Sequence, residues 1–333
     1  MSAGPRPVPH TPAVAGEAAR AGESGLCPLD RLHLAALAVI SGLTVINLPT
    51  LGPSAALLLA VLTALAAAGV IAARRAGGST AFRVLHDFSP IVLILAVFWL
   101  LGVVIAAANP TPWDPFFAAL DRRWFGALPD HWRAALGRPA WFVDLNALLY
   151  ASYYVLPLIV AIPLYLRDRD TFHQLTFAAT LTFYAVCVGY FVCPTVGPRV
   201  PAGINGLGGG ALTRALEAFL AVVETTRTDA FPSGHVAVAL VCLWYARRAP
   251  VAVRWVVVPL VAGIAFSTVY LHYHYVVDVV VGTGLAVACV WLGPSIEALM
   301  DPRRAAGSGA KGTDGRRWGG SPCARRTRRA SIT

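Results

Sequence analysis

Long apolar runs with almost no charged residues recur along the chain, separated by short segments rich in charge, proline or glycine. About 20 apolar residues in a helix cross the hydrocarbon core of a bilayer, and each run is able to span it with some tilt. Because the runs are continuous rather than alternating, they favour helices over the strands of an outer-membrane barrel. The pattern predicts an all-α polytopic transmembrane helical bundle. About eight spans are expected, at residues 33–48, 54–73, 88–108, 141–166, 174–193, 232–246, 251–271 and 275–293.

The composition excludes a soluble protein. Of the 333 residues, 57% are hydrophobic and only 13% are charged, whereas soluble domains carry about 25% charge. The mean hydropathy is +0.63. The six cysteines show no CxxC spacing, so neither a disulfide framework nor a zinc knuckle is indicated. Residues 1–30 are rich in proline, alanine and glycine, and are expected to form a disordered arm rather than a cleavable signal.

Basic residues predict the orientation in the membrane. Arginines follow the second, fourth and sixth spans, and nine lysines and arginines follow the eighth, in a chain of net charge +10. The positive-inside rule makes these segments and both termini of a multi-pass cell-membrane protein cytoplasmic. The disordered tail at 297–333 is expected to contact anionic lipid rather than nucleic acid. The opposite, extracytoplasmic loop near 109–140 also holds arginines, but its tryptophans suggest an amphipathic helix in the interface.

Polar residues gather at the extracytoplasmic ends of three spans, and ionisable residues there are functional candidates. In the third group, from Tyr270 to Asp278, His274 and Asp278 are four residues apart and are expected to share one helix face. The carboxylate would then hold one ring nitrogen and leave the lone pair of the other free, as a nucleophile or base requires. An isolated pair of this kind is equally well explained by helix packing.

The other two groups offer ligands for an anion. Pro232-Ser233-Gly234-His235 marks a helix start, where the backbone N–H groups of Ser233, Gly234 and His235 are expected to bind an anion. The side chain of His235 is expected to protonate a leaving oxygen. Arg199 ends a Pro/Gly turn and is expected to clamp phosphate oxygens. The alternatives are an ordinary capped helix and a lipid-headgroup anchor. Convergence of all three groups on one membrane face favours phosphoryl transfer through a phosphohistidine.

Pro-Ser-Gly-His followed some forty residues later by His-x-x-x-Asp resembles the type 2 phosphatidic acid phosphatase superfamily, which shares its fold with vanadium haloperoxidases. Pro-Thr-x-Gly-Pro-Arg at 194–199, and more weakly Asp121 to Gly126, resemble the inositol phosphorylceramide synthase branch. The resemblance implies a six-helix catalytic core in the C-terminal two-thirds, at 88–296, preceded by two extra helices at 31–87.

The resemblance also implies roles for individual residues. His274 would be the phosphorylated nucleophile, Asp278 its partner and His235 the general acid. Arg199, Ser233 and Gly234 would be the phosphate ligands.

The chain departs from the superfamily pattern at several positions. Val192 stands where a lysine is expected, Val200 replaces the proline after the arginine, and Ser267-Thr268 replaces a Ser-Arg pair. The lost basic residues are also absent from the inositol phosphorylceramide synthase branch. Their absence leaves the site less positive, so Arg214 and Arg227 are candidates for additional phosphate contacts.

The function expected from these features is that of a lipid phosphate phosphotransferase, with an alcohol such as inositol as the acceptor. With water as the acceptor, it would be a lipid or polyprenyl phosphate phosphatase. A non-catalytic lipid transporter or scaffold is the alternative from another class. No metal or cofactor is expected, since no further ligand completes a site at His272, His274 and Asp278. No obligate protein partner is evident.

Other features of the sequence have further interpretations. A serine hydrolase built on Ser233 and His274 would leave His235 unexplained. The glycine-rich segment at 203–210 is interpreted as a lid. Tyr150, Tyr153 and Tyr154 are expected to pack in the bundle or to line a lipid-tail groove.

Overall fold

A computed structural model describes residues 26–75, 79–199, 208–224 and 226–301. Within these ranges the chain forms helices α2 to α14 and one 3-10 turn, and no strand. One isolated parallel bridge joins Thr195 and Asp229. The predicted all-α fold is therefore confirmed. Most of the arm at 1–30 and of the tail at 297–333 lies outside the described residues, although α14 extends to Leu299.

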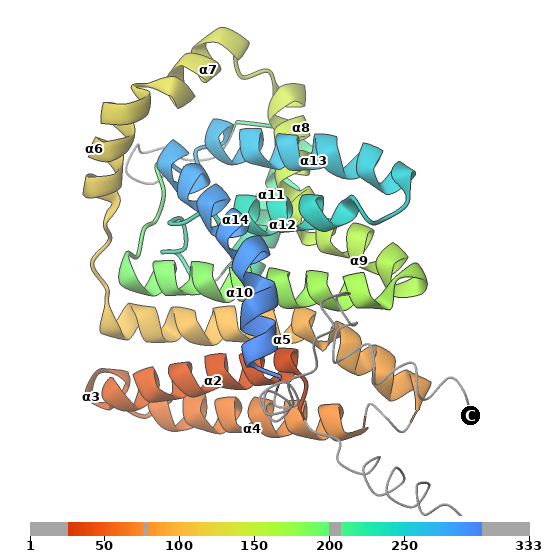
Figure 1. Ribbon diagram of the computed structural model, residues 1–333. Coiled ribbons are helices and arrows are strands. Elements are labelled where there is room, and N and C mark those ends of the chain that lie inside the picture. The colour runs from red at the N-terminus through yellow and green to blue at the C-terminus, as the bar shows by residue number, and fades with distance from the viewer. Residues whose placement is uncertain (1–25, 76–78, 200–207, 225, 302–333) are drawn as a thin grey trace, which may run out of the picture.

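Three N-terminal helices form a layer beside the rest of the molecule (Figure 1). They are α2 (Pro28–Ile46), α4 (Ser54–Arg75) and α5 (Thr80–Ala108), with the short α3 (Leu48–Leu51) between the first two. Their buried side chains form one apolar cluster with those of α10 (Arg169–Val192), which lies next to this layer. All four long helices are apolar enough to cross a membrane.

Two more helices, α13 (Val251–Tyr270) and α14 (Val276–Leu299), are also long and apolar enough to cross a membrane. The number of such helices among the described residues is therefore six. The predicted single span at 141–166 is instead broken. It consists of α8 (Ala140–Ala151), a 3-10 turn (Ser152–Tyr154) and α9 (Leu156–Arg167), with a bend of 41°. Pro157 explains the break, because proline lacks an N–H group and disfavours helix at the preceding residue.

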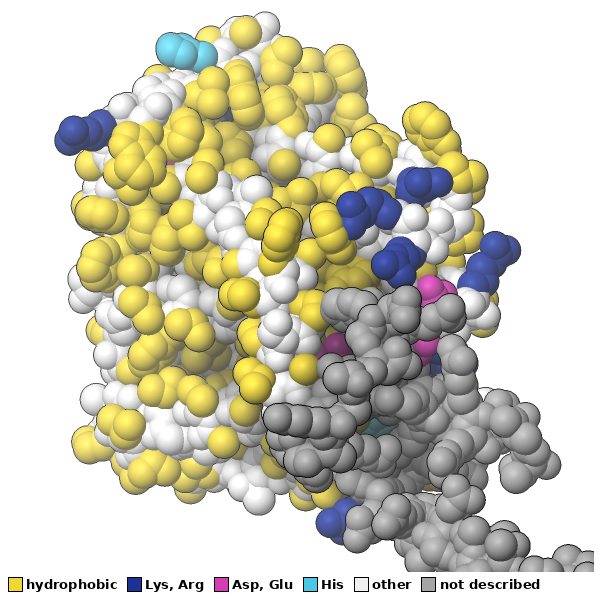
Figure 2. Space-filling view, in the orientation of Figure 1, with side chains coloured by type: hydrophobic (Ala, Val, Ile, Leu, Met, Phe, Trp, Pro, Cys, Tyr) yellow, Lys and Arg dark blue, Asp and Glu magenta, His cyan; other side chains and the backbone are white. Residues whose placement is uncertain are grey.

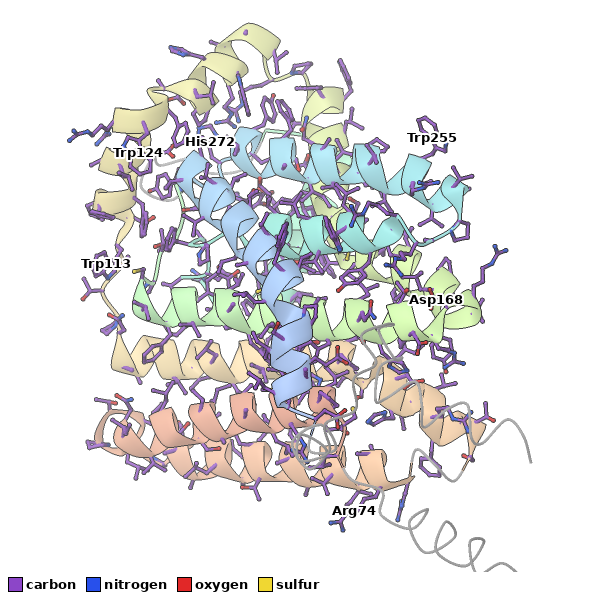
Figure 3. The ribbon with its side chains drawn as sticks, in the orientation of Figure 1. Arg74, Trp113, Trp124, Asp168, Trp255 and His272 are labelled. Carbon is purple, nitrogen blue, oxygen red and sulfur yellow. The ribbon has the colours of Figure 1, made fainter. Side chains whose placement is uncertain are left out.

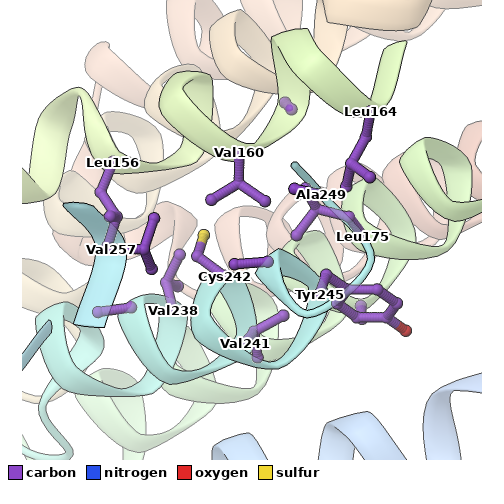
Figure 4. Close-up of a cluster of buried hydrophobic side chains, with 14 of the residues drawn as sticks. Leu156, Val160, Leu164, Leu175, Val238, Val241, Cys242, Tyr245, Ala249 and Val257 are labelled. Carbon is purple, nitrogen blue, oxygen red and sulfur yellow. The ribbon is translucent and has the colours of Figure 1, made fainter. Parts of the chain in front are cut away.

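The sixth predicted span, at 232–246, is the short helix α12 (Gly234–Ala246). Its 13 residues extend about 20 Å, less than the roughly 30 Å of a bilayer core. Apolar residues are buried around much of its circumference, as in a helix enclosed by others. Figure 4 shows Val238, Val241 and Cys242 of this helix packed against Val160 and Val257. This packing holds α12 in the centre of the bundle.

The two ends of the bundle differ in their side chains. Figure 3 shows His272, Trp113 and Trp124 at one end, called here the site end, and Asp168 and Trp255 at the other, called the arginine end. In Figure 2 hydrophobic side chains cover most of the visible face, and basic side chains gather at the edge where α12 is joined to α13. Exposed arginines at the arginine end are Arg167, Arg247, Arg248 and Arg254.

Three short helices lie at the site end: α6 (Asp114–Phe125), α7 (Leu128–Leu136) and α11 (Ala211–Val223). The first two form the segment that was expected to be an amphipathic helix, and Figure 1 shows them outside the main bundle. Trp113 and Trp124 are exposed there. Placement of this segment in the membrane interface remains a prediction.

Candidate active site

The three polar groups of the sequence meet at the site end around a cavity of about 530 Å³. It brings together residues from the start of α12, the turn before α14, the turn after α10, and α11. Its lining consists of Tyr150, Val196, Arg199, Glu217, Leu220, Ala221, Glu224, Thr226, Arg227, Asp229, Ala230, His235, His272, Tyr273 and His274. Of the six predicted site residues, Arg199, His235 and His274 line this cavity, whereas Ser233, Gly234 and Asp278 lie behind its wall.

His274 is buried two residues before α14 begins, with 3% of its surface exposed. Its Nδ1 lies 2.8 Å from the backbone carbonyl oxygen of Ala230. A carbonyl oxygen only accepts hydrogen bonds, so Nδ1 carries the proton and Nε2 keeps its lone pair. The tautomer that was expected to depend on Asp278 is therefore set by a backbone carbonyl.

Asp278 is fully buried at the third position of α14, and its carboxylate lies 3.6 Å from His274 Nδ1. Because His274 precedes the helix, the two residues do not share a helix face as expected. The Asp278 carboxylate accepts a hydrogen bond of 2.8 Å from the N–H group of Tyr275, and so caps α14. Its negative charge remains close enough to stabilise a positive charge on the His274 ring.

His235 is the second residue of α12, and its ring centroid lies 5.7 Å from that of His274. Tyr150 and Tyr153 flank it, with ring centroids at 4.4 and 4.2 Å. Its Nε2 is buried and, within the described residues, has no hydrogen-bond partner. The nearest carboxylate oxygen is Glu224 Oε1, at 3.7 Å. The aromatic rings therefore fix the imidazole while one nitrogen stays available to a ligand.

Ser233 and Gly234 have structural roles that differ from those expected. The N–H group of Ser233 donates to the backbone oxygen of Asp278 at 3.0 Å, so it is not available to an anion. The Ser233 side chain caps α12 by accepting from the N–H group of Val236. A side chain at position 234 would collide with the hydroxyl of Tyr190. The two residues hold α12 against its neighbours, which leaves the first free N–H groups of the helix at Gly234 and His235.

Arg199 is held by a turn that α6 supports. Both carboxylate oxygens of buried Asp114 accept hydrogen bonds of 2.9 Å, from the N–H groups of Val196 and Gly197. Gly197 has a φ of +93°, a conformation that side chains rarely adopt. The guanidinium of Arg199 bonds Glu217 at 2.7 Å and the Tyr273 hydroxyl at 3.2 Å. The clamp that was expected to bind phosphate is thus already engaged by a carboxylate.

Three carboxylates in the cavity were missed by sequence reasoning: Glu217, Glu224 and Asp229. Burial raises the pKa of Glu224. Burial, reinforced by the charge of Glu224, raises the pKa of Asp229 well above its usual value. Asp229 could have been identified from the sequence, because it lies only four residues before Ser233 of the Pro-Ser-Gly-His motif. Glu217 and Glu224 lie on and just after α11, a helix that hydropathy alone did not predict.

The remaining sequence candidates divide between cavity and surface. Arg227 lines the cavity, whereas Arg214 is exposed on α11. Tyr150 lines the cavity, and Tyr154 donates to Glu224 at 2.6 Å, so these tyrosines support the site as well as packing. Most of the proposed lid at 203–210 lies outside the described residues.

Possible metal ligands lie elsewhere. His272 Nε2 faces Asp130 at 3.3 Å, and among the described residues no third His, Cys or acidic ligand joins them. Within the described ranges, one group has the proximity that a metal requires: donor atoms of Cys27, Asp30 and His86 lie within 4.8 Å of one another, on α2 and α5. The same atoms form a helix cap and an ion pair of 2.8 Å between Asp30 and His86. That group is separate from the cavity.

Comparison with protein families gives one match. The model of the PAP2 superfamily matches residues 115–292, more than half of the chain, from α6 to α14. Comparisons with curated proteins and with solved structures give no significant match. The matched region contains every residue predicted for the site, and it confirms the resemblance to type 2 phosphatidic acid phosphatases at the level of the superfamily. On this match, together with the all-helical membrane fold, the chain belongs to the PAP2 superfamily.

Proposed function

We propose that the protein is a membrane enzyme that transfers a phosphoryl group from a lipid phosphate through a phosphohistidine on His274. The observation that carries this proposal is the hydrogen bond between His274 Nδ1 and the Ala230 carbonyl. It leaves Nε2 as the nucleophilic atom of a ring that lines the cavity together with His235. Membership of the PAP2 superfamily supports the reaction class.

In the first step, His274 Nε2 attacks phosphorus, and the bond from phosphorus to the lipid oxygen breaks. Protonated His235 gives its proton to that oxygen. Asp278, at 3.6 Å from His274 Nδ1, stabilises the positive charge that develops on the ring. The N–H groups at the start of α12 and the guanidinium of Arg199 are the groups that contact the phosphoryl oxygens. The phosphate must therefore compete with Glu217 for Arg199.

In the second step, an acceptor oxygen attacks the phosphohistidine and gives its proton to His235. We propose an alcohol acceptor, as in inositol phosphorylceramide synthases, to which the Pro194–Arg199 segment is similar. We also propose that the site opens to the extracytoplasmic side of the cell membrane, because the short loops at the opposite end of the bundle carry exposed arginines. Both termini would then be cytoplasmic. The arginines exposed at the site end, Arg122, Arg123, Arg138 and Arg214, lie instead in the long segments around α6, α7 and α11.

The test is to incubate purified protein with a panel of lipid phosphates, with and without alcohols, and to measure free phosphate and phosphorylated alcohol. The proposal expects turnover that His274→Ala abolishes. Phosphate release alone would assign the enzyme as a phosphatase. Absence of both products with every donor would favour a transporter or scaffold and would overturn the proposal.

A further inference from the structure

Two carboxylates in the cavity are unexplained by phosphate binding. Glu217 is paired with Arg199 at 2.7 Å. Glu224 and Asp229, in contrast, have no arginine or lysine partner within the described residues, and both line a cavity meant to receive an anion. Negative charges next to a phosphate weaken its binding. Their position suits a different ligand group, one that carries hydrogen-bond donors.

The geometry around His235 identifies that group. Its Nε2 is buried without a hydrogen-bond partner in the described part of the chain, and Glu224 Oε1 lies 3.7 Å away. This separation is too long for a direct hydrogen bond, and an oxygen atom at about 2.8 Å from each would bridge them. The Tyr154 hydroxyl donates to the same Glu224 oxygen at 2.6 Å and holds it in place. A ligand hydroxyl in this position satisfies both groups.

We propose that Glu224 and Asp229 form a hydroxyl-binding subsite, through which the enzyme accepts a polyhydroxylated alcohol rather than a simple one. This inference rests on the proposed function and specifies its acceptor. One hydroxyl bridges Glu224 and His235, and neighbouring hydroxyls reach Asp229. Several hydroxyls on adjacent carbons are needed to occupy two carboxylates, so sugars, cyclitols and glycerol belong to the expected class.

The reaction at this subsite is balanced. After the first step, His235 has given up its proton and accepts one at Nε2. The bridging hydroxyl transfers its proton to His235, its oxygen forms a bond to phosphorus, and the bond from phosphorus to His274 Nε2 breaks. His235 is then protonated for the next cycle, and His274 regains its lone pair. No oxidant, reductant or further reactant is required.

The protonation of the two carboxylates agrees with this role. Burial raises the pKa values of both, and the charge of Glu224 raises that of Asp229 further. Either carboxyl is therefore protonated more readily than in water, and a protonated carboxyl is a hydrogen-bond donor beside a carboxylate acceptor. Hydroxyl groups both donate and accept hydrogen bonds, so they match such a pair better than a phosphate does.

The experiment uses purified full-length protein and 4-nitrophenyl phosphate, with myo-inositol, glycerol or ethanol at equal hydroxyl concentration. The ratio of phosphorylated alcohol to free phosphate is measured for each acceptor. We expect the ratio to be at least tenfold higher for a polyol than for ethanol. Asp229→Asn, which removes a contact to the neighbouring hydroxyls, should lower the polyol ratio about tenfold and leave the ethanol ratio within twofold. Glu224→Gln, which alters the contact to the reacting hydroxyl of either alcohol, should lower the formation of both phosphorylated alcohols.

Glu217→Gln is the matched control. It changes a carboxylate of the same cavity that contacts Arg199, so it should alter formation of both products without changing their ratio. An equal ratio for polyols and ethanol, an unchanged polyol ratio in Asp229→Asn, or unchanged formation of both phosphorylated alcohols in Glu224→Gln would overturn the hydroxyl subsite while leaving the proposed function intact. No product from 4-nitrophenyl phosphate or from any lipid phosphate of the panel would overturn both. Melting temperature and elution volume identify a misfolded variant, and the comparison of polyol with ethanol in the unmodified protein then decides.

Discussion

Asp114 provides the most informative test of how the site is built. Its carboxylate, 5% exposed, accepts hydrogen bonds from Val196 and Gly197 and a third, of 3.2 Å, from the Tyr275 hydroxyl. It thereby connects α6 to the turn that carries Arg199 and to the start of α14. Asp114→Asn keeps the size of the side chain and replaces one accepting oxygen with an NH2 group, which cannot accept from an N–H group.

The magnitude follows from these bonds. A hydrogen bond to a charged group contributes about 1.5–3 kcal/mol, and Asp114→Asn loses one such bond and weakens the others. Arg199 then loses its fixed position and its contact to the phosphate. If that contact also contributes about 1.5–3 kcal/mol, its loss lowers kcat/KM roughly 10- to 100-fold. A positioning role predicts that Asp114→Asn and Arg199→Ala are not additive, because both remove the same contact.

The assay compares kcat/KM, inhibition by vanadate and melting temperature for the two single variants and the double variant. Asp168→Asn is the matched control, because this carboxylate also accepts a backbone N–H group, that of Thr171 at 3.1 Å, but lies at the arginine end (Figure 3). It should lower the melting temperature and leave kcat/KM within about threefold. If Asp114→Asn behaved like Asp168→Asn, or if its effect added fully to that of Arg199→Ala, the positioning role would be refuted.

Three further predictions concern metal dependence, proton transfer and topology. Activity should survive EDTA and be blocked by vanadate, and loss in EDTA with recovery on adding zinc or magnesium would remove the proposed mechanism. His235→Ala should lower turnover of a lipid phosphate about a hundred- to ten-thousand-fold, with partial rescue by a nitrophenyl ester, whose leaving group needs no proton; equal losses on both substrates would refute its role as the acid. In a background without native cysteines, Arg214→Cys should react with an impermeant maleimide in intact cells and Arg254→Cys only after permeabilisation; the reverse result would invert the orientation.

Hydropathy predicted the membrane fold well because long apolar helices depend mainly on the removal of apolar side chains from water, whether into lipid or into the bundle. It did not predict the break between α8 and α9, although Pro157 marks its place. It also placed a full span at 232–246, where α12 has 13 residues. A short apolar helix that is enclosed by others has the same local sequence pattern as a membrane span, so length alone distinguishes them.

The site was predictable to the extent that short motifs carry local geometry. Pro-Ser-Gly-His did predict the start of a helix, and His274 and His235 do lie at one cavity. The partners of these residues were not predictable, because they depend on distant contacts. The Ala230 carbonyl sets the tautomer of His274. The backbone oxygen of Asp278 accepts a hydrogen bond from the N–H group of Ser233, and the Glu217 carboxylate pairs with Arg199. Such contacts arise from the packing of helices far apart in the sequence.

The most direct test of the account is to trap the covalent intermediate. Purified protein is mixed with a donor labelled with ³²P, quenched in alkali and digested, and the labelled peptide is sequenced. The account predicts label on His274 that is stable to alkali and lost in acid, as a phosphorus–nitrogen bond requires, and no label in His274→Ala. Turnover without label on His274, or label that persists in His274→Ala, would contradict it.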